Sequence, residues 1–276
     1  MCVRTRAEPL YKSSLDARNM GNNKATLITA PVGNNPARVR MLVYYKGLED
    51  QIEMKSPADY GGLMTDEYRK TNPQGKMPAL ILSTGEVLFE ASVIMGYLLD
   101  IYQDVGPRVG ATTPEMRARS ALLSQVHNLY IASANSSHPS VTATQGCMYK
   151  AVDQIDAETR ALKFAELWKQ CGVIESLLVG PYAAGEALTE ADFTLWPTIS
   201  CFLPFILPKF GWVNVLEDEA RFPKIKAWHA AVGVLPAAQR VKEEVMGGLK
   251  QWEAAGRFEP IVEQMAGRPD LKSKFP

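Results

Sequence analysis

The sequence is poor in the residues on which disulfide-bonded and metal-dependent proteins rely. Its 276 residues include only four cysteines, at positions 2, 147, 171 and 201, and only three histidines. The cysteines are scattered and form no C-x-x-C pair, so we expect free thiols in a reducing compartment rather than a disulfide framework. No His or Cys pair has the spacing of metal ligands, which argues against a zinc site.

Neither sign of charge is in excess. Thirty basic and thirty acidic side chains give a formal net charge of zero. Nucleic acids and anionic membranes attract proteins with an excess of basic charge, so we expect neither as a partner.

Two segments bear on localisation. Residues 1–23 have no apolar run, so we expect no secretory signal, and their mixture of acids and bases favours a disordered arm over an organellar transit peptide. We therefore expect a cytoplasmic protein, with organellar targeting by this arm left open. The most apolar segment, residues 194–212, contains Pro197, Pro204 and Pro208. Three prolines in one span indicate a buried, kinked helix rather than a membrane-spanning one.

Residues 25–103 alternate strand-like and helix-like patterns. Gly47 ends one expected helix, Asn72-Pro73 ends another, and the turn at Thr84-Gly85 joins two short apolar runs into an antiparallel hairpin. The expected elements are strands at 25–29, 51–55, 79–83 and 86–89 and helices at 36–46, 67–70 and 91–102. This order predicts a compact α/β layer.

The remainder of the chain reads as helical. Residues 104–113 are rich in Pro, Gly and Thr and indicate a linker. Helices are expected at 114–134, 153–178, 189–205, 223–232 and 236–254. Residues 256–276 have no strong periodicity, so disorder and packing over the helices both remain open.

One helix start is marked unusually well. In LTEADFTLW, Thr189 is a candidate N-cap with Asp192 at the third helical position, and Leu188 and Phe193 have the spacing of a hydrophobic staple. We interpret this capping box as structural.

The stretch TNPQGKMPALILSTGEVLFEAS, residues 71–92, places a proline where a strand should begin. Pro78 has no N–H for a sheet ladder, and its setting favours a cis peptide bond after Met77. The Met77 N–H and C=O would then face out of the sheet edge. An extended peptide-like ligand could pair with them by β-augmentation.

Glu90 follows twelve residues after Pro78, immediately before a helix. The first N–H groups of that helix, at Ala91 and Ser92, favour an anionic group, whereas the Glu90 carboxylate favours an ammonium group. A ligand with a peptide backbone, a carboxylate and an amino group would satisfy all three features. Glutathione has that set.

On these motifs the sequence resembles the glutathione transferase superfamily, as a theta- or nu-like member or one of an unclassified branch. The family pattern of Asn-Pro, Gly-Lys, Val-Pro and Glu-Ser appears as TNPQGKMPAL…LFEASVI, and the helical half contains GEALTEADFTLW and RFPKIKAWHAAV. The resemblance runs from about residue 25 to 245. It implies a thioredoxin-like α/β glutathione-binding domain at 24–103, the linker, and an all-α substrate domain with a C-terminal tail at 114–276.

The resemblance also implies roles for single residues. Met77 would pair its backbone with the cysteinyl part of glutathione, and Glu90 and its neighbour would hold the γ-glutamyl end. Lys76 would reach a carboxylate or be a solvated loop charge. Ala91 replaces the family's serine, which removes a hydroxyl worth on the order of 1 kcal/mol unless Ser92 compensates. The expected glutathione-binding residues are Lys76, Met77, Pro78, Glu90, Ala91 and Ser92.

The group that activates the thiol is less obvious. The loop APVGNNPARVR contains no Tyr, Ser or Cys, and the family's usual serine position falls at or near Gly33. Some branches use an asparagine in this loop, and Asn35 matches their spacing. Asn35 and Asn34 are therefore the candidate catalytic residues, with Thr29 weaker because it belongs to a strand. In the alternative interpretation, both asparagines only form the turn and cap the helix.

Several other residues have a structural explanation. A lone helical His127 is more often packed or solvated than catalytic, and the aromatic residues of 194–212 are expected in the core. Met64, Met116, Tyr130 and residues of the tail are candidate walls of a substrate pocket.

The leading hypothesis is a glutathione transferase that joins the glutathione thiolate to a small hydrophobic electrophile and works as a homodimer. A second is glutathione-dependent reduction, isomerisation or lysis, although no cysteine lies in the first loop to form a mixed disulfide. A third is a non-catalytic binding or assembly module of the same fold, such as that of the elongation factor gamma subunit.

Overall fold

The computed structural model describes residues 24–132 and 144–271 of the chain. The predicted disordered arm at 1–23 and the last residues of the tail, 272–276, lie outside the described residues. So does the end of the helix expected at 114–134.

The N-terminal part is a four-stranded mixed sheet with helices. The strand order is β2-β1-β3-β4, with β2 parallel to β1 and the other two neighbouring pairs antiparallel. Its elements are β1 (Ala25–Ile28), α1 (Asn34–Lys46), β2 (Ile52–Lys55), α2 (Asp66–Thr71), β3 (Ala79–Ile81), β4 (Val87–Phe89) and α3 (Ala91–Ile101). This is the thioredoxin-like layer that the sequence predicts, element for element.

Local chemistry explains the bounds of α1. The helix ends at Gly47, whose φ of 66° is left-handed, and the N–H of Leu48 returns to the carbonyl of Val43. A glycine adopts this conformation at no steric cost. Val39, Leu42 and Val43 are fully buried, as their spacing predicts.

The C-terminal part is helical, as expected. Its helices are α4 (Pro114–Val126), α5 (Ala157–Leu177), α6 (Glu190–Pro197), α7 (Leu203–Ile206), α8 (Pro223–Gly233), α9 (Pro236–Ala254) and α10 (Glu259–Ala266). Two of the predicted continuous helices are interrupted by π-helical turns, at His127–Ile131 after α4 and at Thr198–Phe202 between α6 and α7. Of the two alternatives for the tail, packing over the helices is correct, because α10 buries Ile261 and Met265.

The capping box at the start of α6 is present as predicted. The Asp192 carboxylate accepts hydrogen bonds from the Thr189 N–H at 2.8 Å, the Ala183 N–H at 2.7 Å and Trp228 Nε1 at 2.9 Å. Because Asp192 is fully buried, these donors replace the water that its charge would lose on folding.

The apolar segment around α6 lies inside the protein. Among the described residues, Glu190–Phe210 is the one helical span long and apolar enough to cross a membrane, and 78% of its most apolar window is buried in the fold. Trp196, Phe202, Phe210 and Trp212 belong to the core. The segment is therefore buried in the core, as expected, and a π-helical turn at Thr198–Phe202 interrupts it.

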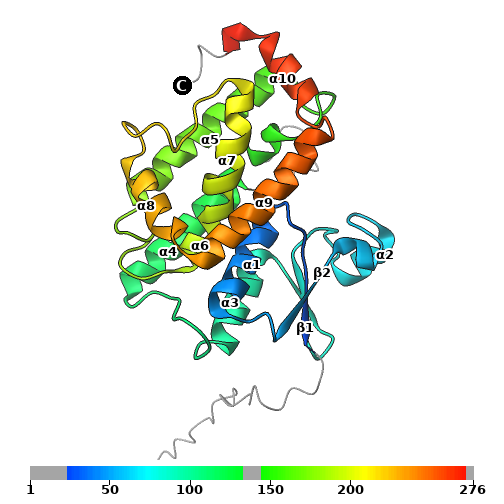
Figure 1. Cartoon of the computed structure of the whole chain (residues 1–276), viewed down its shortest axis with the longest axis vertical. Coiled ribbons are helices and arrows are strands. Elements are labelled where there is room, and N and C mark those ends of the chain that lie inside the picture. The colour runs from blue at the N-terminus through cyan, green and yellow to red at the C-terminus, as the bar shows by residue number, and fades with distance from the viewer. Residues whose placement is uncertain (1–23, 133–143, 272–276) are drawn as a thin grey trace, which may run out of the picture.

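Helix α1 joins the two parts. It packs against α3 of its own layer and against α6 and α9 of the helical part, and Figure 1 shows α9 lying alongside it. The loop between β1 and α1 consequently lies next to residues from both parts of the chain.

Candidate functional site

A cavity of about 450 Å³ lies where the N-terminal layer meets α4. This volume is within the range of small-molecule sites. Seven of the eight predicted site residues line it: Asn35, Lys76, Met77, Pro78, Glu90, Ala91 and Ser92. The structure thus brings together residues from α1, from the segment before β3 and from the start of α3.

A larger hollow of about 810 Å³ lies against β2, β1 and β3 and is lined by Lys24, Glu49 and Glu53 among others. Glu49 is already paired with Arg240, and Glu53 with Lys55. The larger hollow contains none of the predicted site residues, so the smaller cavity is the better candidate for the functional site.

The segment before β3 presents the backbone of Met77 to the cavity. The Met77–Pro78 peptide is cis, as predicted. The preceding carbonyl, of Lys76, accepts hydrogen bonds from the Tyr68 hydroxyl at 2.8 Å and from Asn72 Nδ2 at 2.6 Å, which ties the segment to α2. Within residues 24–132 and 144–271, the N–H and C=O of Met77 have no hydrogen-bond partner. Both groups are available to a ligand.

The start of α3 forms the opposite wall. Glu90 precedes the helix with a φ of 69°, which is rare for a residue other than glycine and is often found at functional sites. Its carboxylate makes no cap hydrogen bond, so it does not satisfy the first N–H groups of α3. These N–H groups and the helix dipole favour an anion, while the exposed carboxylate favours a cation.

The two candidate asparagines face different surroundings. Asn35 lines the cavity, but Asn34 does not. The Asn34 side chain donates from Nδ2 to Thr198 Oγ1 at 3.2 Å and accepts the Asn35 N–H at Oδ1 at 2.9 Å. Asn34 is therefore directed toward the helical part, and of the two only Asn35 can reach a ligand in the cavity.

Sequence reasoning missed Arg38, which also lines the cavity. This side chain is only 4% exposed, and its Nη1 donates to Asn128 Oδ1 at 2.7 Å. Burial lowers the pKa of Arg38 to about 10, against the opposing effect of Glu190 and Glu90, so the guanidinium stays charged at neutral pH. Its spacing of three residues from Asn35 places Arg38 on the same helix face, but its partners Asn128 and Thr194 come from distant parts of the sequence.

His127 is packed, as expected, rather than placed in the cavity. It is fully buried, with Nε2 2.7 Å from Thr198 Oγ1 and Nδ1 3.4 Å from Asn128 Oδ1. Burial, followed by the charge of Arg38, lowers the pKa of His127 to about 3, so the ring is neutral at physiological pH. The contacts continue to Asn34 through Thr198, and the two π-helical turns meet at this point.

Other candidates from the sequence lie elsewhere. Met64, Met116 and Tyr130, predicted as pocket walls, do not line the cavity. Cys147, Cys171 and Cys201 are free and buried, and burial raises the pKa of all three thiols. In the part of the chain that the structure describes, no group of three or more His, Cys, Asp or Glu residues could hold a metal ion.

Comparison with known families identifies the N-terminal part of this arrangement. Residues 34–101, from the start of α1 to the end of α3, match the family model for the glutathione S-transferase N-terminal domain. Residues 34–101 therefore belong to the glutathione S-transferase N-terminal domain family. A glutathione S-transferase domain-containing protein of Dictyostelium discoideum is 27% identical over 199 residues, which cover 70% of each chain.

Relatives within the superfamily differ in the activities that their names give. A disulfide-bond oxidoreductase of Escherichia coli is 26% identical over 188 residues, covering 64% of this chain and 76% of that one. A maleylacetoacetate isomerase of Methylobacterium extorquens, solved with malonate and GSH, has a TM-score of 0.61 at 21% identity and covers 80% and 97% of the two chains. Likeness at this identity shows the glutathione transferase fold, not the reaction.

Two positions depart from the superfamily pattern noted in the sequence. Ala91 stands where a serine is usual, and Gly33 falls at or near the usual position of a thiol-activating serine. A Cβ added to Gly33 would lie 3.0 Å from Pro36 Cγ and 3.5 Å from Met77 Cε, at a φ of 138°. A serine at position 33 would be strained in this conformation.

Proposed function

We propose that the protein binds glutathione in this cavity and transfers it, as the thiolate, to a small hydrophobic electrophile. One observation supports this above the others: the cavity gathers the Met77 backbone, Glu90 with the start of α3, and Asn35. In the binding pose that we propose for glutathione, the Met77 N–H and C=O pair with its cysteinyl backbone. The α-carboxylate of the γ-glutamyl group lies at the α3 N-terminus, its ammonium group lies near Glu90, and Lys76 is within the same cavity for the second carboxylate.

Activation of the thiol requires preferential stabilisation of its anion. A free thiol has a pKa of about 8.5, and lowering it by about two units takes roughly 2.7 kcal/mol. An Asn35 side-chain N–H, the N-terminus of α1 and the buried charge of Arg38 all act in the required direction. Arg38 supplies the formal charge that an amide lacks.

The chemical step then needs only proximity and the thiolate. The sulfur lone pair forms a C–S bond to the electrophilic carbon, and a leaving group departs with its electron pair. Holding both reactants in one site can supply several kcal/mol of the barrier reduction. Val93, Leu129 and Ala132 provide apolar surface on the same cavity for the electrophile.

The proposal is tested by equilibrium titration with glutathione, followed by an aryl-halide conjugation assay. We expect saturable binding and turnover that Glu90→Gln weakens mainly through the KM for glutathione. The matched control is Glu86→Gln, in the turn before β4 and outside the cavity. Binding without turnover would instead identify a non-catalytic module, and no binding at all would contradict the proposal.

A second candidate function is that of a glutathione-dependent reductase, isomerase or lyase. It is supported by the names of two similar proteins, a disulfide-bond oxidoreductase and a maleylacetoacetate isomerase. The three described cysteines are buried, have raised pKa values and do not line the cavity, which disfavours a protein mixed disulfide. A reductase of this chain would need glutathione to supply both thiols. Parallel assays with a small disulfide and with an aryl halide separate the two candidates.

We further propose that the protein works in the reducing cytoplasm as a homodimer. The free, buried cysteines support the compartment. The exposed apolar side chain of Leu122, on α4 and outside the cavity, supports a protein partner there. Light scattering after size-exclusion chromatography should give twice the monomer mass of 30.4 kDa.

A further inference from the structure

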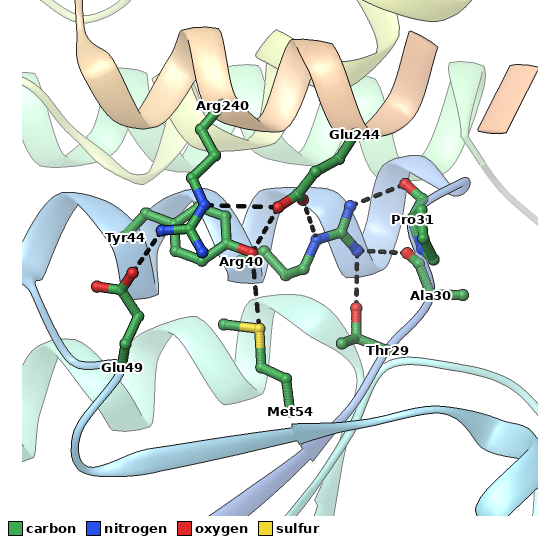
Figure 2. A network of polar contacts seen from close by, with 9 residues as sticks. All are labelled: Thr29, Ala30, Pro31, Arg40, Tyr44, Glu49, Met54, Arg240 and Glu244. Atoms are coloured by element: carbon green, nitrogen blue, oxygen red, sulfur yellow. Dashed lines mark hydrogen bonds and ion pairs between the residues drawn. The ribbon is translucent and has the colours of Figure 1, made fainter. Parts of the chain in front are cut away.

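The loop that leads to Asn35 is held by a buried arginine. Arg40, on α1, is only 3% exposed, and its guanidinium donates to Thr29 Oγ1 at 2.7 Å, to the Pro31 carbonyl at 2.8 Å and to the Ala30 carbonyl. Figure 2 shows the three acceptors arranged around the guanidinium. Arg40 therefore contacts three consecutive residues of the segment that connects β1 to Asn35.

The charge of Arg40 is balanced by the helical part of the protein. Glu244 of α9 accepts from Arg40 Nε at 2.8 Å and from the Tyr44 hydroxyl at 2.7 Å (Figure 2). A buried guanidinium without a carboxylate partner is strongly unfavourable. The position of Arg40, and of the residues that it holds, thus depends on α9.

A second, independent contact reaches the same segment from the next turn of α9. A Cβ added to Gly248 would lie 2.7 Å from Val32 Cβ and 3.3 Å from the Val32 backbone nitrogen. Gly248 follows Glu244 by four residues and therefore lies on the same helix face. At the adjacent Gly247, an added Cβ would meet nothing within 4 Å.

We propose that α9 positions the loop that leads to Asn35, through Arg40 held by Glu244 and through the direct contact of Gly248 with Val32. None of these four residues lines the cavity, so they are positioning residues rather than catalytic ones. The inference rests on the proposed function only in assigning Asn35 to the glutathione sulfur. The clamp, meaning the contacts of Arg40, Glu244 and Gly248 that hold this loop, is a property of the free protein.

The first test measures amide hydrogen exchange over residues 29–37 without any ligand. Gly248→Ala should raise exchange in this segment about tenfold, because the methyl group displaces Val32, whereas the matched Gly247→Ala should leave it unchanged. Equal exchange in the two variants would overturn the proposal.

The second test removes the Glu244 carboxylate instead of adding a methyl group at Gly248. It can therefore decide the proposal even when Gly248→Ala does not fold. Glu244→Ala should raise exchange in residues 29–37 to a similar extent. Glu49→Ala is its control, because Glu49 pairs with Arg240 in the same network without contacting the loop. Unchanged exchange in Glu244→Ala would also contradict the clamp.

A functional readout then separates positioning from general loss of structure. In Gly248→Ala, kcat for conjugation should fall about tenfold and the thiol pKa of bound glutathione should rise, because a small displacement of Asn35 is enough to weaken its contact. The KM for glutathione should change less than about twofold, since Met77 and Glu90 set binding. If no variant binds glutathione, the proposed function fails while the exchange data still decide the clamp.

Discussion

Asn34 and Asn35 carry the same side chain but have different surroundings. Asn35 faces the cavity, whereas Asn34 bonds to Thr198. We expect Asn35→Ala to raise the thiol pKa of bound glutathione by about one to two units, the value of a hydrogen bond to a charged group. Absorbance of the thiolate in a pH titration measures this.

Asn34→Ala is the matched comparison. It should lower the free energy of unfolding by about 1–2 kcal/mol and leave the thiol pKa nearly unchanged, because it removes a contact between the two parts of the chain. If the two variants affected the thiol pKa equally, the distinction between a ligand-facing and a structural asparagine would be wrong.

Ala91 offers a change that should improve binding. Ala91→Ser restores a hydroxyl beside the expected γ-glutamyl group, so the Kd for glutathione should fall about fivefold, equivalent to roughly 1 kcal/mol. Isothermal titration calorimetry measures it. Ser92→Ala is informative alongside: a loss of affinity would show that Ser92 compensates, and no gain in Ala91→Ser would count against the assigned position of the ligand.

His127 should make stability depend on pH. Its pKa is lowered to about 3 in the folded protein by burial and by Arg38, whereas an unfolded histidine titrates near 6.5. Between these values the unfolded chain binds more protons, so stability is lost as the pH falls from about 6.5 toward 3, at up to about 1.4 kcal/mol per pH unit.

Denaturant unfolding at pH 5 and pH 7 measures that loss. His127→Gln, which cannot titrate, should lose less stability than the parent over this interval, even though carboxylates titrate in both. An identical loss in the two proteins would show that His127 is protonated in the fold or exposed to solvent.

Single residues show which features of the cavity are predictable from sequence. The cis bond after Met77 and the helix start at Glu90 are predictable because proline chemistry and helix termini are local properties, and both residues line one cavity. Arg38 was missed because a charged residue inside an apolar helix face looks like an exception until its partners, Asn128 and Thr194, are brought near by folding.

At the scale of elements, the capping box at the start of α6 is clearly marked in the sequence and is important for stability. Asp192, at the start of α6, receives donors from Thr189, Ala183 and Trp228. Asp192→Ala leaves these buried donors unsatisfied, so we expect a loss of about 2–4 kcal/mol in the free energy of unfolding. Urea unfolding followed by circular dichroism measures it.

Asp156→Ala is a matched control for that variant, because Asp156 caps α5 at the surface through the Thr159 N–H. Its loss should be only about 1 kcal/mol, the usual value of an N-cap. Similar losses in the two variants would mean that Asp192 is an ordinary cap.

Strands and helices of the N-terminal layer are predictable because each has its own hydrophobic periodicity and is bounded by residues, such as glycine and proline, that end such elements. The π-helical turns at His127–Ile131 and Thr198–Phe202 are not, since each depends on its partner across the core, with His127 meeting Thr198. The sequence alone does not predict the α10 helix, for a related reason. Its burial depends on surfaces formed far away in the sequence.

At the scale of the whole molecule, contacts between the two parts are buried and polar as well as apolar. Arg38 with Thr194, Asn34 with Thr198 and Arg40 with Glu244 all cross the boundary. We therefore expect one calorimetric unfolding transition rather than two. Glutathione at about 100 times its Kd should raise the stability of that single transition by about 2.7 kcal/mol.

Two separate transitions, with only the first shifted by glutathione, would show that the parts fold independently. The ligand-free scan gives the number of transitions, and the scan with glutathione tests whether both parts respond to a ligand that mostly contacts one of them.

The contact of Gly248 with Val32 limits how this chain can be recombined with its relatives. A chimera that joined residues 24–103 to the helices of another protein would replace α9, and any side chain larger than hydrogen at the position of Gly248 would collide with the loop. Grafting the binding layer therefore requires transplanting one glycine and one glutamate from the far end of the sequence as well.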